Sequence, residues 1–223
     1  MRLIELLFPR KCPFCGKLLE KTEPDLCAEC VKSLPWTGTH AKSHGSFYSA
    51  CVSPLRYTGN ARQAILRFKF ASHASYGACF GKLMADCVRR ELDGTFDVIT
   101  YVPVSFRRFR KRGYSQAKLL AEALGAELGI PCAPLLKKAR HTEAQSHLRG
   151  EAARKANVSG AFVTLPGAEI AGKTVLLADD VVTTGATLAE CSRILLTAGA
   201  EKVYGATLCL AERKPKTGNE REN

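Results

Sequence analysis

The sequence predicts an α/β fold, in which a small zinc module precedes a central parallel sheet flanked by helices. Strand-like and helix-like segments alternate through residues 51–211, and two CxxC pairs fall within the first 35 residues. The composition, 46% hydrophobic and 24% charged over 223 residues, is ordinary for a folded protein. We therefore expect a four-cysteine module over residues 1–45, which includes much of a polar, linker-like stretch at 36–50. An α/β domain over 51–212 and a disordered polar tail over 213–223 would follow.

Four cysteines near the start have the spacing of a metal site. Cys12 and Cys15 form one CxxC pair, and Cys27 and Cys30 form a second. Each pair lets two thiolates approach one ion, and two pairs complete a tetrahedral Cys₄ site for structural zinc. The alternative is redox chemistry, which normally uses a single CxxC at the start of a helix. Because four thiolates close the coordination sphere, we expect no catalytic role for this zinc. The six scattered cysteines are expected to be reduced core residues.

Apolar spacing places five elements in the α/β domain. Residues 97–104 and 173–178 are predicted as buried strands, and 202–210 as another strand. Apolar residues recur at three- and four-residue steps through 115–128 and 187–198, and a glycine follows each segment, so both are predicted as helices. Strands that alternate with helices in this order predict right-handed crossovers and a parallel sheet.

The segment 175–187 is the most informative part of the sequence. It passes from a buried strand through paired acids to hydroxyl residues around a glycine, and then into a helix. Backbone amides at a helix N-terminus favour an anion, and a glycine permits close approach of the backbone. The paired carboxylates suit the cis-diol of a ribose, or Mg²⁺ held by it. These features predict a ribose 5-phosphate site; the alternative is that Asp180 or Thr184 only caps the helix. The candidate residues are Asp179, Asp180, Thr183, Thr184, Gly185, Ala186 and Thr187.

The net charge of +12 is concentrated in one part of the chain. Residues 101–160 contain twelve Lys/Arg and four Asp/Glu, which favours nucleic acid or phosphorylated ligands as partners. Five basic residues occupy the six positions 107–112, where the alternative is a solvated, charged turn.

Nothing in the sequence predicts insertion into a membrane. No apolar run reaches the roughly 18 residues of a membrane span. The first eight residues are too short for a signal sequence, and Glu5 interrupts them. We therefore expect a cytoplasmic protein.

Residues 175–187 resemble the phosphoribosyl-pyrophosphate (PRPP) signature of type I phosphoribosyltransferases. Over about residues 5–212, the chain resembles the competence protein F (ComF, ComFC-like) family, which is described as amidophosphoribosyltransferase-like. Ser115 stands where the family usually has asparagine. The motifs that carry the resemblance are, in order, the four cysteines, Tyr57-Thr58-Gly59, Lys69-Phe70, Arg112-Gly113-Tyr114-Ser115-Gln116-Ala117, the set Arg140, Thr142, Gln145, Arg154 and Asn157, and the 175–187 loop.

The resemblance implies a type I phosphoribosyltransferase fold that binds PRPP with Mg²⁺. It implies that Asp179 and Asp180 contact the ribose hydroxyls and that residues 183–187 hold the 5′-phosphate. Ser105 and Arg112 become candidates for the pyrophosphate. Residues 140–157 are expected to form a lid, whose Arg140 and Arg154 would act as catalytic cations on the departing pyrophosphate. The alternative for this segment is an exposed amphipathic helix.

Three functions remain open at this point. The first is a PRPP-binding accessory protein for DNA uptake in natural transformation, which handles single-stranded DNA beside a helicase or recombination protein. The second is a phosphoribosyltransferase that moves ribose 5-phosphate to an amine or nucleobase and releases pyrophosphate. The third is a PRPP sensor without turnover.

Overall fold

The computed structural model describes residues 10–20, 23, 25–70, 73–139 and 156–211. Within these ranges a six-stranded sheet has the order β1-β2-β8-β7-β4, and β3 pairs with the C-terminal end of β8. β1 runs antiparallel to β2, and the other pairs of this sheet are parallel. β5 and β6 form a separate antiparallel pair. The strands are β1 (Lys42–Gly45), β2 (Tyr48–Val52), β3 (Leu55–Arg56), β4 (Val98–Tyr101), β5 (Leu136–Lys138), β6 (Phe162–Thr164), β7 (Thr174–Val182) and β8 (Lys202–Leu210).

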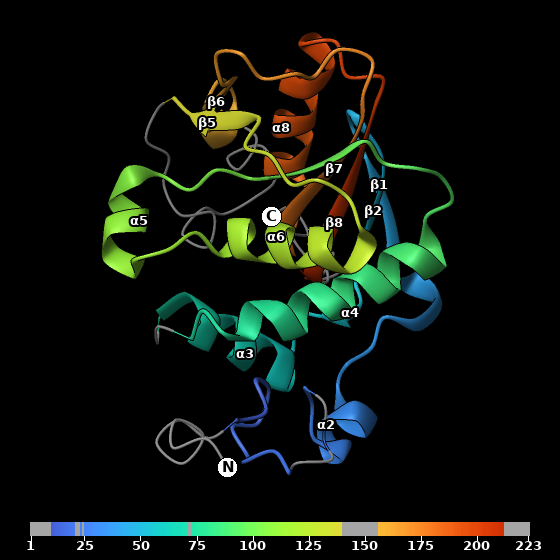
Figure 1. The fold of residues 1–223 in the computed structure, drawn as a ribbon, viewed down its shortest axis with the longest axis vertical. Helices are drawn as coiled ribbons and strands as arrows, with labels where there is room; N and C mark the ends of the chain where they lie inside the picture. Colours follow the sequence, from blue (N-terminus) through green and yellow to red (C-terminus); the bar gives the residue numbers. More distant parts are fainter. Residues whose placement is uncertain (1–9, 21–22, 24, 71–72, 140–155, 212–223) are drawn as a thin grey trace, which may run out of the picture.

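Helices cover both faces of the sheet (Figure 1). One face packs against α3, α4 and α6, and the other packs against α8. Successive residues of β7 point to opposite faces, so Leu176 contributes to the first core and Leu177 to the second. This explains why β7 is apolar along its whole buried length. The helices are α2 (Ala28–Ser33), the 3₁₀ turn η1 (Gly38–His40), α3 (Gly59–Phe70), α4 (Tyr76–Glu91), α5 (Phe106–Arg112), α6 (Gln116–Leu128) and α8 (Ala186–Thr197).

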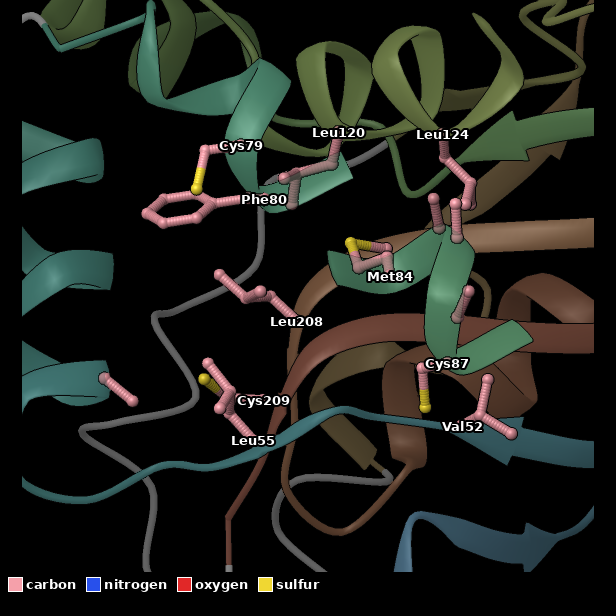
Figure 2. Close-up of a cluster of buried hydrophobic side chains, with 14 of the residues drawn as sticks. Val52, Leu55, Cys79, Phe80, Met84, Cys87, Leu120, Leu124, Leu208 and Cys209 are labelled. Carbon is pink, nitrogen blue, oxygen red and sulfur yellow. The ribbon is translucent and has the colours of Figure 1, made fainter. Parts of the chain in front are cut away.

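The larger core lies between α4, α6 and the sheet. Figure 2 shows Phe80 and Met84 of α4 beside Leu120 and Leu124 of α6, above Leu208 of β8. All five side chains are at most 1% exposed. The two helices approach so closely that a Cβ on Gly81 would lie 2.4 Å from Cβ of Ala123. Any larger residue at position 81 would therefore push α4 away from α6.

The described residues of the zinc-module segment pack into the core of the α/β domain. Phe14 is fully buried, and its ring lies 5.4 Å from the ring of Phe80 in α4. In α3, Arg67 donates through Nη1 to the Phe14 carbonyl at 2.9 Å. Figure 1 places this segment beside α3 and α4, on the opposite side of the molecule from α8. The two parts of the chain thus share one hydrophobic cluster.

Most of the elements predicted from apolar spacing are confirmed, and three expectations need correction. The strand predicted at 97–104 is shorter, since β4 ends at Tyr101. The stretch 36–50 is not a linker: it contains η1, β1 and the start of β2, which joins the central sheet through β8. The strand predicted at 173–178 continues to Val182, because β7 keeps pairing with β8 as far as Val182 and Leu210. The acids therefore lie within the end of a strand rather than after it. The strand at 202–210 is confirmed at both ends.

The expectations for the cysteines and for membrane spans can also be compared with the described residues. Nine of the ten cysteines are buried or half-buried, Cys15 is exposed, and all ten are free of disulfides. In the part of the chain that the structure describes, every helix is too short or too polar to cross a bilayer.

Candidate functional site

The four cysteines of the two CxxC pairs come together in one cluster. Their Sγ atoms all lie within 4.8 Å of one another, and those of Cys15 and Cys27 are 3.6 Å apart. Sulfurs at tetrahedral positions about 2.3 Å from zinc would be separated by about 3.8 Å. The spacing of the donors therefore fits a zinc ion, and the prediction of Cys12, Cys15, Cys27 and Cys30 as a cluster is confirmed.

Backbone geometry aims these thiols at one point. Gly16, at φ +81°, allows the tight turn after the first pair, and its amide donates to the Cys12 carbonyl at 2.8 Å. Cys27 caps α2, where its Sγ accepts from the Cys30 amide at 3.4 Å. Burial raises the pKa of the Cys30 thiol, and the neighbouring cysteine sulfurs raise it further. Four thiolates this close need a cation, which is what a structural zinc supplies.

The second site begins at the end of β7, where Asp179 and Asp180 project from opposite faces of the sheet. Asp180 lies on the face covered by α3, and Asp179 lies on the face covered by α8. Asp179 accepts through Oδ1 from the Asp180 amide at 2.8 Å. Burial, followed by the charge of Asp180, raises the pKa of the Asp179 carboxyl to about 7. The pair therefore holds a proton more readily than two exposed acids would.

Lys69 neutralises part of this acid pair. It stands in the last turn of α3, and its Nζ lies 2.6 Å from Oδ2 of Asp180. The two side chains are 21% and 13% exposed, so the ion pair is largely shielded from water. Burial lowers the pKa of Lys69, but the charge and hydrogen bond of Asp180 and the charge of Asp179 together outweigh it, so the pKa is raised and the ammonium stays charged. Asp180 can thus hold a cation, as coordination of Mg²⁺ would also require.

The loop after β7 forms the other half of the site. Gly185, at φ +77°, is the N-cap residue of α8, whose first residue is Ala186. A pocket at this point is lined by Asp179, by most of the predicted loop residues and by Thr207 of β8. Thr184 is outside this lining, and its hydroxyl accepts from the Ala186 amide at 3.4 Å, as the helix-capping alternative suggested. The predicted residues that line the pocket are Asp179, Thr183, Gly185, Ala186 and Thr187.

Tyr48 packs against the backbone of the loop at Gly185. It is the first residue of β2 and is 8% exposed. A Cβ on Gly185 would lie 2.7 Å from the Tyr48 hydroxyl, so only glycine fits between the loop backbone and this side chain. Phe47, which precedes it, has φ +68°, a conformation that aromatic residues rarely adopt. The strained turn between β1 and β2 therefore sets the position of a residue that supports the loop.

The basic run 107–112 forms α5, with Ser105 as its N-cap. Ser105 is 8% exposed, and its Oγ has no hydrogen-bond partner among the described residues. Burial lowers the pKa of Arg108, the charge of Arg112 lowers it further, and the charge of Asp180 opposes both. Arg108 therefore lies within electrostatic reach of both Arg112 and the acid pair. Arg112 donates through Nη1 to Oε1 of Gln116 at 2.8 Å.

The predicted site residues fall into three groups. Asp179, Thr183, Gly185, Ala186 and Thr187 line one pocket, and Asp180 adjoins it. Ser105 is the N-cap residue of α5, and Arg112 is its last residue. Arg108, which lies between them, interacts with the charges of both Arg112 and Asp180. The predicted lid residues Arg140 and Arg154 lie outside the described residues. Prediction from the sequence missed Lys69, Tyr48 and Thr207, and it named Arg108 only as part of the basic run 107–112. Of the three that were missed, only Lys69 carried a signal, as part of the Lys69-Phe70 motif.

Comparisons with known proteins agree with this geometry. Residues 110–223 match the model of the phosphoribosyl transferase domain, and residues 3–53 match that of the double zinc ribbon domain. The DNA utilization protein YhgH of Salmonella typhimurium is 33% identical over 208 residues, covering 89% of this chain and 83% of that protein. Competence protein F of Haemophilus influenzae is 30% identical over 219 residues, covering 88% and 95%. Among solved structures, the allosteric regulatory enzyme of purine biosynthesis aligns with a TM-score of 0.44 and 23% identity, over 64% of this chain and 29% of that one.

Together, the parallel sheet, the acid pair before a glycine loop and the four-cysteine cluster define a phosphoribosyltransferase-type domain joined to a zinc ribbon. The sequence relatives then fix the family. The chain belongs to the family of competence protein F and the DNA utilization protein YhgH, the ComF family.

Proposed function

We propose that this protein binds PRPP, or a related ribose 5-phosphate, in the pocket at the end of β7. The observation that carries the proposal is that one pocket joins Asp179 to the Gly185 loop at the start of α8. Amides at the start of a helix favour an anion, and carboxylates accept hydrogen bonds from a diol. A ligand that presents a phosphate and a ribose diol side by side satisfies both halves of the pocket.

Each part of the ligand has a matching group in the site. Residues 183–187 would hold the 5′-phosphate, and Asp179 and Asp180 would accept from the ribose hydroxyls. The unsatisfied Ser105 hydroxyl and the guanidinium groups of Arg108 and Arg112 would face the pyrophosphate. Mg²⁺ bound with the ligand near the acid pair would offset the charge of the pyrophosphate.

A titration of the zinc-loaded protein tests this proposal. Calorimetry with PRPP, in the presence of Mg²⁺, is expected to show one site, and Thr187→Val is expected to weaken binding by removing one hydroxyl donor. Thr164→Val, at the half-buried end of β6, is the matched control and should bind as the wild type does. If PRPP and ribose 5-phosphate both fail to bind the wild type, the proposal is wrong.

We propose further that the protein serves DNA uptake by contacting single-stranded DNA in the cytoplasm, beside a helicase or recombination protein. The outward face of α5 supports this role. Phe106 is 74% exposed and Phe109 is 45% exposed, and the Arg110 guanidinium lies 5.8 Å from the centre of the Phe106 ring. Exposed aromatic rings among basic side chains suit the stacking of bases and contact with phosphates. The names of the relatives, a competence protein and a DNA utilization protein, point the same way.

DNA binding by α5 can be measured by fluorescence anisotropy with a labelled single strand. Neutralising Arg107, Arg110 and Lys111 to Gln should weaken binding and flatten its dependence on salt, because fewer counterions are released. Phe106→Ala should weaken binding without changing the salt dependence. The same three-residue neutralisation at Arg62, Arg89 and Lys202, on other surfaces, is the control. Equal losses in both triple variants would contradict a role for α5.

A second candidate function, transfer of the ribose 5-phosphate, is favoured by the cations near the acid pair. The departure of pyrophosphate from an oxocarbenium-like centre requires positive charge on the leaving group, and Arg108 and Arg112 would place it there. Arg140 and Arg154 would add to it. Pyrophosphate release that needs both an amine or nucleobase and Asp179 would establish turnover. If PRPP binds tightly but no acceptor causes release of pyrophosphate, the transferase function is wrong and only the binding function stands.

A further inference from the structure

The end of α3 delivers an ammonium group into the acid pair, and a neighbouring motif fixes its position. Lys69 Nζ lies 2.6 Å from Asp180 Oδ2, with both side chains mostly buried. We propose that Lys69 is the resident counter-cation of the diol-binding acids, and that Tyr114 and Gln116 are positioning residues that hold it there. This inference rests on the proposed PRPP pocket and adds to it a cation supplied by the chain itself.

The positioning contacts converge on one carbonyl. The last carbonyls of a helix have no partner within it, and the Phe68 carbonyl is one of these in α3. The Tyr114 hydroxyl donates to this oxygen, and Gln116 donates to it through Nε2 at 3.4 Å. The Tyr114 ring also packs on the Phe68 ring, with 6.0 Å between centroids. Phe68 immediately precedes Lys69, so these contacts fix the backbone from which the lysine reaches Asp180.

The motif Arg112-Gly113-Tyr114-Ser115-Gln116 thereby acquires a structural role. Arg112 donates to the Gln116 Oε1, so the Gln116 amide has its oxygen satisfied and its nitrogen aimed at Phe68. Ser115 caps α6 by accepting from the Lys118 amide at 3.3 Å. The motif thus connects α5, α6 and the end of α3. Arg112, a candidate for the pyrophosphate, is in this way connected through Gln116 to the helix end that carries Lys69.

Electrostatics explains why such a lysine matters. Two adjacent carboxylates repel a polyanion such as PRPP, and the repulsion is strong in a shielded site. A divalent cation is the usual remedy, but a fixed ammonium cancels part of the charge before any ion arrives. The wild-type protein should therefore retain much of its PRPP affinity without Mg²⁺, and a protein without the ammonium should depend on Mg²⁺.

The main test compares the PRPP affinity of the zinc-loaded protein in buffer without Mg²⁺ and in buffer with millimolar Mg²⁺. Chelators are left out because they would remove the structural zinc. Lys69→Met is expected to lose at least about tenfold in affinity without Mg²⁺, as removal of a charged partner does, and to recover most of it with Mg²⁺. The wild type should change much less between the two conditions. Lys82→Met, which breaks a 3.6 Å contact with Asp25 beside the zinc module, is the matched control and should bind as the wild type does.

The positioning contacts are tested by a milder change. Tyr114→Phe keeps the ring against Phe68 and removes only the hydroxyl donor. We expect a loss of about two- to tenfold in affinity without Mg²⁺, again recovered when Mg²⁺ is added. Tyr204→Phe, in β8 with its ring packed on Phe96, is the control and should show no change. A Tyr114→Phe loss of equal size with and without Mg²⁺ would contradict action through Lys69.

A second measurement does not depend on PRPP. In the ligand-free protein, Lys69 should exclude a divalent cation from Asp180. Electron paramagnetic resonance with Mn²⁺ should therefore detect a site in Lys69→Met that is at least about tenfold weaker in the wild type. If Lys69→Met does not fold, as circular dichroism would show, the Tyr114→Phe series decides the question.

The outcomes separate this inference from the proposed function. If the wild type binds PRPP, and Lys69→Met matches it both in PRPP affinity without Mg²⁺ and in Mn²⁺ binding, the role of Lys69 is overturned and the pocket stays in place. No PRPP binding by the wild type, together with a new Mn²⁺ site in Lys69→Met, overturns the proposed ligand. In that case Lys69 is still shown to be the counter-cation of the acids.

Discussion

The zinc module and the proposed PRPP site are built in opposite ways. All four zinc ligands lie within 19 consecutive residues, Cys12 to Cys30, and local turns are enough to bring their sulfurs together. The proposed site combines the pocket at β7 and the start of α8 with Lys69 at the end of α3, Tyr48 after the β1–β2 turn and the basic residues of α5. A site made of one segment needs a metal to stabilise it, whereas a site made of five segments is stabilised by the whole fold. Removal of zinc and mutation of the pocket should therefore have different consequences.

Loss of zinc is expected to have the largest effect on stability. Structural zinc contributes about 10–16 kcal/mol of binding free energy in small modules, and 1 kcal/mol shifts the Tm of a protein of this size by about 2–4 °C. Cys27→Ser, or treatment with a chelator, should lower the Tm by more than about 10 °C because Phe14 and the larger core are coupled. Calorimetry and zinc analysis measure this. Cys132→Ser, outside the cluster, should keep both values, and an unchanged Tm in Cys27→Ser would contradict a structural role for the metal.

Asp180→Asn should have the largest effect on ligand binding. The change removes an acceptor for the ribose diol and the partner of Lys69, so PRPP affinity should fall by at least about tenfold. The variant should also be less stable, by less than the roughly 3–5 kcal/mol of a fully buried pair, because both side chains retain some exposure. Calorimetry gives the affinity, and urea unfolding gives the stability. Asp86→Asn, in an exposed pair with Arg89, should change neither quantity.

Gly185→Ala should separate backbone strain from loss of the site. Both Gly185 and Gly167 have positive φ, at +77° and +75°, but only a Cβ at 185 meets the Tyr48 hydroxyl. Each alanine is expected to cost about 1–2 kcal/mol in stability, as for any left-handed residue. Only Gly185→Ala should also weaken PRPP binding. Equal PRPP affinity in the two variants would show that the loop does not hold the phosphate.

Arg67→Met should have the smallest effect, since it weakens one contact between the two regions. Arg67 donates to the Phe14 carbonyl at 2.9 Å and to the Pro13 carbonyl at 3.4 Å. Its loss should lower stability by about 1–2 kcal/mol and leave PRPP affinity within about twofold of the wild type. Arg62→Met, exposed on the same helix, is the control. A large loss of PRPP affinity in Arg67→Met would show that the zinc module is coupled to the pocket.

The contrast between the regions also explains what the sequence could predict. The cysteine cluster was predicted in full because CxxC spacing alone determines which sulfurs can meet. The Gly185 loop and its pocket residues were predicted because strand, acids, glycine and helix follow one another directly. The helix at 116–128 and the strand at 202–210 were predicted from regular apolar spacing. These are all local signals.

The errors arise where distant segments meet. Lys69 reaches Asp180 across more than a hundred residues, and Tyr48 reaches Gly185 across a longer separation, so spacing could not predict either contact. The 36–50 stretch has a polar, linker-like composition, and it forms strands because β8 offers β2 a partner. The length of β7 was underestimated because the paired acids were taken to end the strand. The β-branched Val181 and Val182 that follow them are the signal that it continues.

The central claim is that the pocket and the neighbouring residues of α5 together hold both ends of PRPP, and phosphorus NMR tests it most directly. With zinc-loaded protein and Mg²⁺, the 5′-phosphate and the pyrophosphate resonances should both shift or broaden. The 5′-phosphate effect should be lost in Gly185→Ala, and both effects should persist in Gly167→Ala. PRPP resonances that are the same with and without the wild-type protein would contradict the account.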